Sequence, residues 1–188
     1  MIELILGGAR SGKSALAEKI AQESRLKVTY LATAQAGDSE MASRITHHQA
    51  RRPVQWSLLE EPLHLAAALE QQAAPGKCLL VDCLTLWLSN LIFQGDAWRQ
   101  IEAGKVVTCP LFLRELQSLL ETLPRLQGHI ILVSNEVGLG IVPMGPVNRF
   151  YTDENGRLNQ AIAKLADQVT FVAAGLPLVL KSTPVHMG

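Results

Sequence analysis

The chain has 188 residues, 48% hydrophobic and 18% charged, which suits one domain with a buried core that needs neither a disulfide nor a metal to fold. Lysine plus arginine and aspartate plus glutamate number 17 each, so the formal net charge is zero. This balance argues against a general nucleic-acid binder or a protein of anionic membrane surfaces, since both normally carry a basic excess.

The first part of the chain alternates short aliphatic runs with longer amphipathic stretches. We predict buried strands where aliphatic and β-branched residues run together, and helices where apolar residues recur on one face. Pro53 ends one of these helices, because the residue before a proline disfavours the helical conformation. The expected strands are 2–6, 27–33 and 77–82, and the expected helices are 13–24, 38–51 and 63–72.

The second part continues the alternation, with a glycine- and proline-rich loop at 138–146. Residues 92–110 match no usable pattern, and we interpret them as a surface connection. The expected strands are 129–135, 169–174 and 178–181, the last two forming a hairpin, and the expected helices are 110–123 and 156–168. The pattern predicts an α/β domain over residues 1–181, with a mostly parallel sheet, helices on both faces and a C-terminal antiparallel hairpin. Residues 182–188 are expected to be a C-terminal tail.

A glycine-rich segment between the first strand and the first helix fits the phosphate-binding pattern G-x-x-x-x-G-K-[ST]. Its place between a strand and a helix makes the motif credible, although a plain glycine turn is the alternative. Backbone N–H groups would turn toward phosphate oxygens, Lys13 would reach the β- and γ-phosphates, and Ser14 would bind Mg²⁺. We therefore expect a P-loop NTPase fold of the RecA-like type. The predicted phosphate-binding residues are Gly7, Gly8, Ala9, Arg10, Ser11, Gly12, Lys13 and Ser14.

A magnesium site needs a second anionic ligand, and Asp82 is the candidate. It ends an apolar strand, as a Walker-B carboxylate does, and would face the phosphate loop across neighbouring strand ends. The alternative is that Asp82 caps the N-terminus of the helix expected at 84–91, and the two roles are compatible.

Two motifs bear on the class of P-loop protein. The N-K-x-D pattern with which signalling GTPases read guanine is absent. Asp-Glu-Asn-Gly at 153–156 resembles the GTPase D-x-x-G motif, but it comes late in the chain, and we interpret it as a turn and helix start. A small-molecule kinase and an ATPase module coupled to motion both remain open on these grounds.

Two adjacent histidines, His47 and His48, stand just before Arg51 and Arg52. A metal pair is disfavoured, because adjacent side chains diverge by about 100° on a helix and point to opposite faces on a strand. A solvated helix end is one interpretation. The other is a nucleophile, since an imidazole can attack the α-phosphorus of a nucleotide, expel pyrophosphate and hold the nucleotidyl group, with the arginines binding phosphate.

The cysteines and the termini predict the compartment. Cys78, Cys83 and Cys109 are odd in number and lack C-x-x-C spacing, so we expect no disulfide framework and a reducing environment. No signal peptide precedes the first strand, and no apolar run reaches the roughly 18 residues of a membrane span. We therefore expect a cytoplasmic protein.

Together these segments resemble the bifunctional adenosylcobinamide kinase / adenosylcobinamide-phosphate guanylyltransferase family of cobalamin biosynthesis. The most specific resemblance is the pattern R-I-x-x-H-x-x-x-R-P-x-x-W at 44–56 combined with N-E-V-G-x-G-I-V-P at 135–143. The matching blocks are 7–14, 30–35, 40–56, 79–91, 133–143 and 149–181, which cover nearly the whole chain.

The resemblance implies two reactions on one fold. ATP or GTP phosphorylates the hydroxyl of the aminopropanol arm of adenosylcobinamide, and GMP from GTP then passes to that phosphate through a guanylylated histidine. The family's nucleophile lies four residues after the arginine of R-I and four before the arginine of R-P. Counted from Arg44 and Arg52, this position is His48 rather than His47.

The resemblance also implies further binding positions and an assembly. Glu61 is adjacent to one of these positions, Glu60, and a one-residue shift in alignment would exchange the two. The loop 138–146 and Arg149 resemble the part of the family that closes over the nucleotide or corrinoid, and the family resembles a homotrimer with clefts shared between subunits. A P-loop kinase without guanylyl transfer and a non-catalytic nucleotide sensor are the alternative functions. The carried-over nucleotide-binding residues are Thr33, Ala34, Gln35, Gln49, Ala50, Arg51, Arg52, Glu60 and Asp82.

Overall fold

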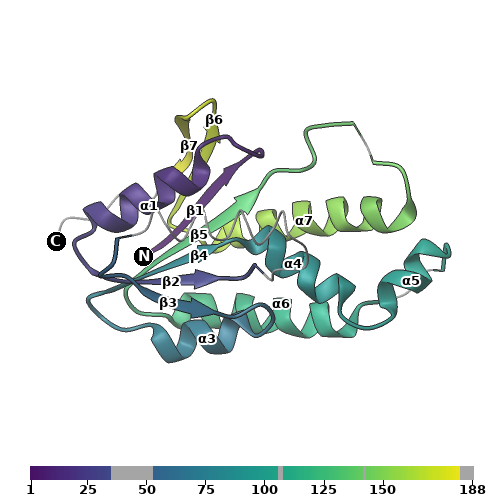
Figure 1. Ribbon diagram of the computed structural model, residues 1–188, viewed down its shortest axis with the longest axis horizontal. Helices are drawn as coiled ribbons and strands as arrows, with labels where there is room; N and C mark the ends of the chain where they lie inside the picture. The colour runs from purple at the N-terminus through teal and green to yellow at the C-terminus, as the bar shows by residue number, and fades with distance from the viewer. Residues whose placement is uncertain (35–52, 106–107, 142, 183–188) are drawn as a thin grey trace.

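The computed structural model describes residues 1–34, 53–105, 108–141 and 143–182, and a central sheet organises them. The strands are β1 (Ile2–Gly7), β2 (Lys27–Ala32), β3 (Ser57–Glu60), β4 (Lys77–Asp82), β5 (His129–Asn135), β6 (Gln168–Ala173) and β7 (Leu176–Ser182). Their order in the sheet is β3-β2-β4-β5-β1-β6-β7 (Figure 1). All pairings are parallel except that of β6 with β7, which is an antiparallel hairpin. This confirms the predicted sheet type.

Helices cover both faces of the sheet, as predicted. They are α1 (Lys13–Glu23), α3 (Leu65–Gln72), α4 (Leu84–Phe93), α5 (Ala97–Glu102), α6 (Pro110–Thr122) and α7 (Pro146–Leu165), with a 3-10 turn η1 (Leu123–Arg125). On one face, Ala17 and Ala21 of α1 pack on Ile5 and Leu80. On the other face α3, α4, α6 and α7 share a larger core. Figure 1 shows α1 on the opposite side of the sheet from α3 and α6.

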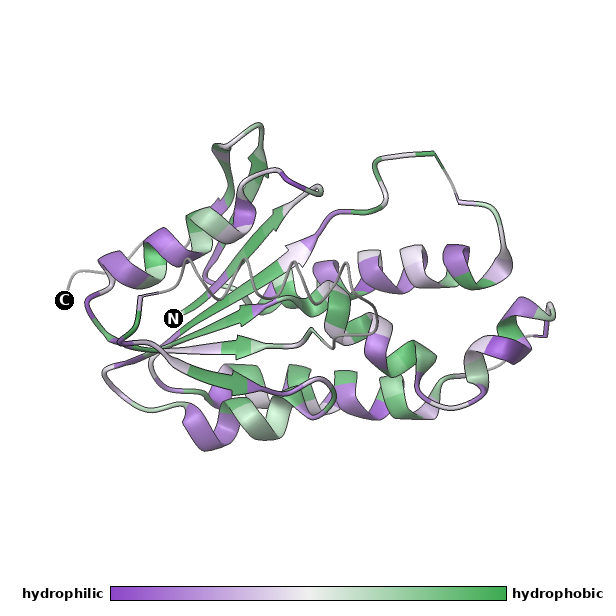
Figure 2. Ribbon diagram, in the orientation of Figure 1, coloured by the Kyte–Doolittle hydropathy of each residue, from purple (hydrophilic) through white to green (hydrophobic). Residues whose placement is uncertain are grey.

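The central strands are apolar along almost their whole length, because helices cover both of their faces. Every residue of β1 is buried, as are all but the last of β5 and all but the two ends of β4. Figure 2 shows these strands as mostly hydrophobic, whereas the surrounding helices alternate between polar and apolar residues. The sequence pattern identified them for this reason, and their predicted bounds agree with the structure to within one residue.

Strand β3 and helix α5 were not predicted from the sequence. Strand β3 was not predicted, because four partly or fully exposed residues at the edge of a sheet carry almost no apolar pattern. The region 92–110, interpreted as a surface connection, contains α5, and Ile101 of that helix is buried in the core. The helix expected over 38–51 lies outside the described residues.

Helix α7 corrects the expectation for residues 146–168. It begins at Pro146 rather than at 156, so Asp-Glu-Asn-Gly at 153–156 lies inside a helix and is neither a turn nor a helix start. A glycine in a helix interior costs only about 1 kcal/mol relative to alanine. Burial of Leu158 and Ile162, each fully buried, offsets that cost, at about 1.5–3 kcal/mol for a large apolar side chain.

Cys78, Cys83 and Cys109 are all buried free thiols. Among the helices of the described ranges, none is both long enough and apolar enough to cross a membrane.

The continuity of α7 can be tested at Gly156. A Cβ added at this position would meet no atom within 4 Å, so alanine fits without strain. We expect Gly156→Ala to raise the free energy of unfolding by about 0.5–1 kcal/mol, because alanine loses less backbone entropy on becoming helical. Urea denaturation followed by circular dichroism measures this, and a clear loss of stability would contradict an unbroken helix.

Candidate active site

The phosphate loop occupies the carboxyl edge of the sheet, between the last residue of β1 and the first residue of α1. Gly7 pairs with Asn135 of β5 on one side and with Val172 of β6 on the other. Ligands of parallel α/β sheets bind outside the carboxyl ends of the strands. The predicted P-loop therefore stands where the fold places a binding site.

Two glycines let the loop pack against the C-terminal hairpin. A Cβ on Gly7 would lie 2.6 Å from the Val172 carbonyl oxygen and 2.5 Å from Ser11 Oγ. Gly12 has a φ of +98°, and a Cβ there would lie 3.2 Å from the Cα of Gly175. The Gly175 N–H donates to the Ser11 carbonyl at 2.8 Å, so the β6–β7 turn braces the loop.

Lys13 brings a buried cation to the loop. Only 8% of the residue is exposed, and Nζ donates to the Gly8 carbonyl at 3.1 Å. Burial lowers the pKa of Lys13, while the nearby groups of Cys83 and Asp82 act to raise it. An anionic phosphate beside this ammonium group would stabilise its charged form.

Asp82 stands at the end of β4, close enough to Lys13 to influence its charge. Its Oδ2 accepts a hydrogen bond from the Tyr30 hydroxyl at 3.0 Å. The N-cap of α4 is Cys83, with no side-chain capping bond, so the interpretation of Asp82 as the cap is wrong. Burial raises the pKa of the Cys83 thiol to about 11, which keeps this neighbour neutral at pH 7.

Ser14 and Asp82 are chemically suited to Mg²⁺, which prefers hard oxygen ligands. Ser14 is in the first turn of α1, and Asp82 lies on the same edge of the sheet and near Lys13. Magnesium typically keeps several waters and uses only one or two protein oxygens beside the phosphates. Accordingly, a larger cluster is not required, and no group of three His, Cys, Asp or Glu gathers in the described ranges.

Thr33 has a structural task in addition to any binding role. Its hydroxyl is fully buried, accepts from the Cys83 N–H at 2.9 Å and donates to the Cys83 carbonyl at 2.7 Å. These bonds connect the end of β2 to the end of β4, and they use the Thr33 hydroxyl as both donor and acceptor to the Cys83 backbone. Ala34 follows at the same edge of the sheet.

Glu60 lies far from the phosphate loop. Its strand, β3, is four places from β1 in the sheet, which is about 19 Å at the usual strand spacing of about 4.8 Å. The neighbouring Glu61 is occupied locally, since Oε1 accepts the N–H groups of Leu63 at 2.9 Å and His64 at 2.7 Å. The exposed Glu60 is therefore the freer of the two carboxylates.

The remaining predicted site residues lie outside the described part of the chain. They are Gln35, His48, Gln49, Ala50, Arg51 and Arg52. In the sequence they follow β2, whose carboxyl end lies on the side of the sheet that holds the P-loop.

Sequence reasoning assigned no role to a polar corner between β5 and α7. The Asn135 N–H donates to Thr85 Oγ1 at 2.6 Å, and the Tyr151 hydroxyl donates to the Thr85 carbonyl at 3.1 Å. Asn159 Nδ2 donates to the Asn135 carbonyl at 3.1 Å. The available signal was the polar pair Asn135-Glu136 at the end of an apolar strand, beside asparagines at helical spacing in 155–159.

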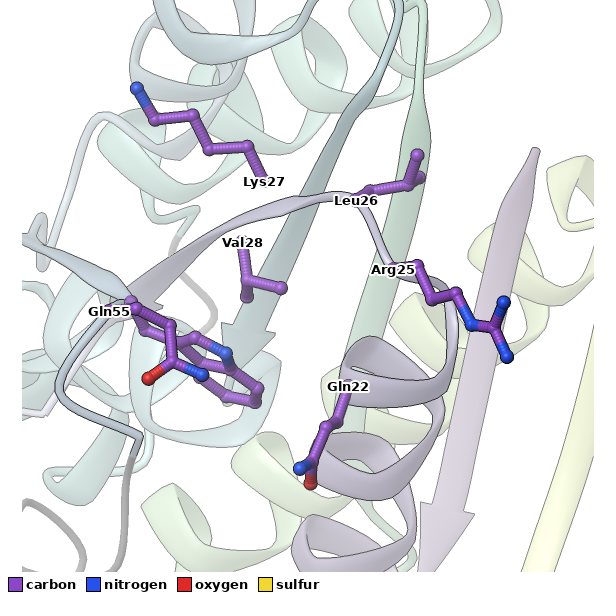
Figure 3. Close-up of a pocket in the computed structure, with 7 residues that line it drawn as sticks. Gln22, Arg25, Leu26, Lys27, Val28 and Gln55 are labelled. Carbon is purple, nitrogen blue, oxygen red and sulfur yellow. The ribbon is translucent and has the colours of Figure 1, made fainter.

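A separate hollow lies at the other end of α1 (Figure 3). It has a volume of about 330 Å³ and is lined by Gln22, Arg25, Leu26, Lys27, Val28, Gln55 and Trp56. An 11-residue helix is about 16 Å long, so this hollow is separated from the phosphate loop by the length of α1. We do not include it in the candidate site.

Comparison with known sequences covers almost the whole chain. Residues 3–180 match the family described as "Cobinamide kinase / cobinamide phosphate guanyltransferase". The "Bifunctional adenosylcobalamin biosynthesis protein CobP" of Pseudomonas aeruginosa is 56% identical over 98% of this chain and 100% of its own length. The "Bifunctional adenosylcobalamin biosynthesis protein CobU" of Escherichia coli is 36% identical over 96% and 100%.

Comparison with solved structures supports the fold alone. The type III secretion ATPase EscN of enteropathogenic E. coli has a TM-score of 0.56 at 15% identity, over 92% of this chain and 43% of that one. A second type III secretion ATPase from pathogenic bacteria has a TM-score of 0.55 at 14% identity, over 95% and 56%. These likenesses confirm the P-loop ATPase architecture predicted from the sequence.

The close approach at Gly7 gives a stability prediction with a matched control. We expect Gly7→Ala to lower the free energy of unfolding by about 1–3 kcal/mol, because the new methyl group would press on the rigid Val172 carbonyl. Gly8→Ala should stay within about 0.5 kcal/mol, since a Cβ there meets nothing within 4 Å. Urea denaturation of both variants measures the difference, and equal stabilities would contradict the packing at Gly7.

Proposed function

The chain belongs to the cobinamide kinase / cobinamide phosphate guanyltransferase family, and from this membership we propose that it phosphorylates adenosylcobinamide and then guanylylates the product. The observation that carries the proposal is full-length similarity to bifunctional relatives, joined to a P-loop that is correctly placed at the sheet edge. GTP, ATP and adenosylcobinamide with its phosphate are the proposed substrates. A kinase without guanylyl transfer is the less favoured alternative, because both relatives described above are named as bifunctional proteins.

In the kinase step, the loop 8–12 and the N-terminus of α1 bind the phosphates of the triphosphate through backbone N–H groups. Lys13 exchanges its hydrogen bond to Gly8 for the phosphate oxygens and balances charge as the γ-phosphoryl group moves to the acceptor hydroxyl. Ser14 and Asp82 would hold Mg²⁺, which supplies charge neutralisation on the transferring phosphoryl group.

In the guanylyl-transfer step, we propose His48 as the nucleophile. A neutral imidazole nitrogen attacks the α-phosphorus of GTP, the bond to the β-phosphate oxygen breaks, and pyrophosphate leaves with the electron pair. An oxygen of adenosylcobinamide phosphate then attacks the same phosphorus and frees the imidazole. The proposal rests on the spacing of His48 from Arg44 and Arg52, which is the family pattern.

Glu60 and Thr33–Ala34 support a nucleotide that extends beyond the P-loop. Both lie toward the β2–β3 side of the sheet, and residues 35–52 fall between these two strands in the sequence. We propose that this side holds the guanine nucleotide during transfer, with Glu60 as a hydrogen-bond acceptor for its sugar or base.

The nucleophile is tested by labelling with GTP that carries ³²P in its α-phosphate. We expect acid-labile, alkali-stable label on the wild-type protein, complete loss of label in His48→Ala, and retention in His47→Ala. Label that persists in His48→Ala would contradict the assignment, and absence of label from the wild type would favour a kinase without transfer activity.

The magnesium ligand is tested with Asp82→Asn. We expect the Mg²⁺ concentration for half-maximal phosphorylation to rise at least about tenfold, as when oriented metal ligands are altered. Asp96→Asn is the control, because Asp96 is exposed and, within the described residues, its side chain pairs with Arg99 of α5 alone. An unchanged Mg²⁺ requirement in Asp82→Asn would exclude Asp82 as a ligand.

A homotrimer is also proposed, on family resemblance and on the exposure of β7. Strand β7 ends the sheet, and Leu176, Leu178, Val179 and Leu180 each expose between 56% and 72% of their surface. A strand edge with apolar residues in water favours pairing or packing with another chain. Light scattering coupled to gel filtration measures the assembly, and a monomer at micromolar concentration would contradict it.

A further inference from the structure

Glu136 lies between the two halves of the kinase site. It directly follows β5, and β5 separates β4, which ends in Asp82, from β1, which ends in the P-loop. The Glu136 N–H donates to the Gly7 carbonyl at 3.1 Å. This bond fixes the residue beside the first residue of the phosphate loop.

The carboxylate of Glu136 is oriented at one oxygen and open at the other. Oε1 accepts the Gly138 N–H at 2.7 Å, whereas no residue of the described ranges bonds to Oε2. The residue is half-buried, and no cation within the described ranges forms an ion pair with it. A carboxylate held in this way can accept a proton at its second oxygen.

Buried polar side-chain atoms without partners lie at the end of β5, which Glu136 follows, and on the elements beside it. Within the described residues, the buried side-chain atoms that lack a hydrogen-bond partner are Ser11 Oγ, Asn135 Oδ1, Asn155 Nδ2 and Asn159 Oδ1. All belong to the loop after β1, the end of β5 or the face of α7 toward it. Such atoms cost about 1–3 kcal/mol each when left unpaired, so this corner fits an incoming group with both donors and acceptors.

The orientation of the asparagines is set by the backbone. Asn159 Nδ2 donates to the Asn135 carbonyl and, at 3.3 Å, to Asn155 Oδ1. Because a carbonyl oxygen can only accept, the Asn159 nitrogen must face it, and this fixes the amide of Asn155 in turn. Asn159 Oδ1 is therefore an unpaired acceptor and Asn155 Nδ2 an unpaired donor, and neither side chain carries a charge.

The other described carboxylates near this end of the strands have a proposed role, an ion partner or a distant position. Asp82 accepts the Tyr30 hydroxyl and is the proposed Mg²⁺ ligand, and Glu154 pairs with Arg157. Glu60 is on β3, four places from β1 in the strand order. Within the described residues, Glu136 is thus the carboxylate whose backbone bonds to the start of the P-loop and whose second oxygen is open.

We infer that Glu136 is the proton acceptor of the kinase step, an inference that rests on the proposed phosphorylation of adenosylcobinamide. The acceptor hydroxyl oxygen bonds to the γ-phosphorus, and the bond from that phosphorus to the bridging oxygen breaks with its electron pair going to the nucleoside diphosphate. The hydroxyl proton passes to Oε2 of Glu136. In guanylyl transfer, the acceptor is already an anionic phosphate and has no proton to lose, so Glu136 has no such role there.

The two reactions therefore provide an internal comparison for Glu136→Gln. Glutamine keeps the size and the acceptor for the Gly138 N–H but is a far weaker base. We expect kcat for phosphorylation of adenosylcobinamide to fall about 10²–10³-fold, with KM for ATP within about twofold. Transfer of GMP from GTP to preformed adenosylcobinamide phosphate should stay within about twofold of the wild type.

Glu70→Gln, on the exposed side of α3, is the matched control and should leave both rates unchanged. Thermal unfolding and ATP affinity of Glu136→Gln establish that the variant is folded and binds nucleotide. Unchanged phosphorylation, or an equal loss in both reactions, would overturn the role of Glu136. Absence of phosphorylation by the wild type would instead overturn the proposed function.

Discussion

The absence of a side chain at Gly7 is the constraint on which the site depends. β1 runs between β5 and β6, and its last residue lies so close to the Val172 carbonyl that a methyl group would not fit. The chain can therefore turn at this point and place Lys13 at the start of α1. The β6–β7 turn closes on the loop from outside through the bond between Gly175 and Ser11. The C-terminal hairpin thus supports the loop as well as ending the sheet.

Lys13 sits in this frame as a buried charge with a weak partner. A carbonyl oxygen is a poor substitute for an anion, and burial lowers the pKa of the ammonium group. In the proposed kinase step, a bound triphosphate would place an anion beside this ammonium group and stabilise its charged form. Asp82 contributes the opposite charge nearby without forming a direct ion pair within the described residues.

The two chemistries of the family make different demands on the same sheet edge. When the acceptor is a hydroxyl group, a base must take up its proton. When the acceptor is an anionic phosphate, no proton is lost, and the reaction needs a nucleophile that carries GMP after pyrophosphate has left GTP. In the proposals made above, Lys13 and Glu136 on the P-loop side serve the first reaction, and the side toward β2 and β3 serves the second. The secretion ATPases share the architecture at 14–15% identity, so the fold by itself does not specify either reaction.

The sequence by itself determined the central strands, the place of the glycine-rich loop between a strand and a helix, the place of Asp82 at the end of a strand, and the family. These features have strong local signals, since strands buried on both faces read as unbroken apolar runs and the loop needs glycine and lysine at fixed spacing. Only the tertiary structure decided strand β3 and the start of α7. A half-exposed strand at the edge of a sheet has little hydrophobic pattern in its sequence. In α7, the burial of apolar side chains offsets the helix-weakening effect of Gly156. Only the folded chain brought Glu136 to the Gly7 carbonyl and set the asparagines of α7 against the end of β5. Residues distant in sequence share no local pattern, and their contact depends on the order in which the strands pair.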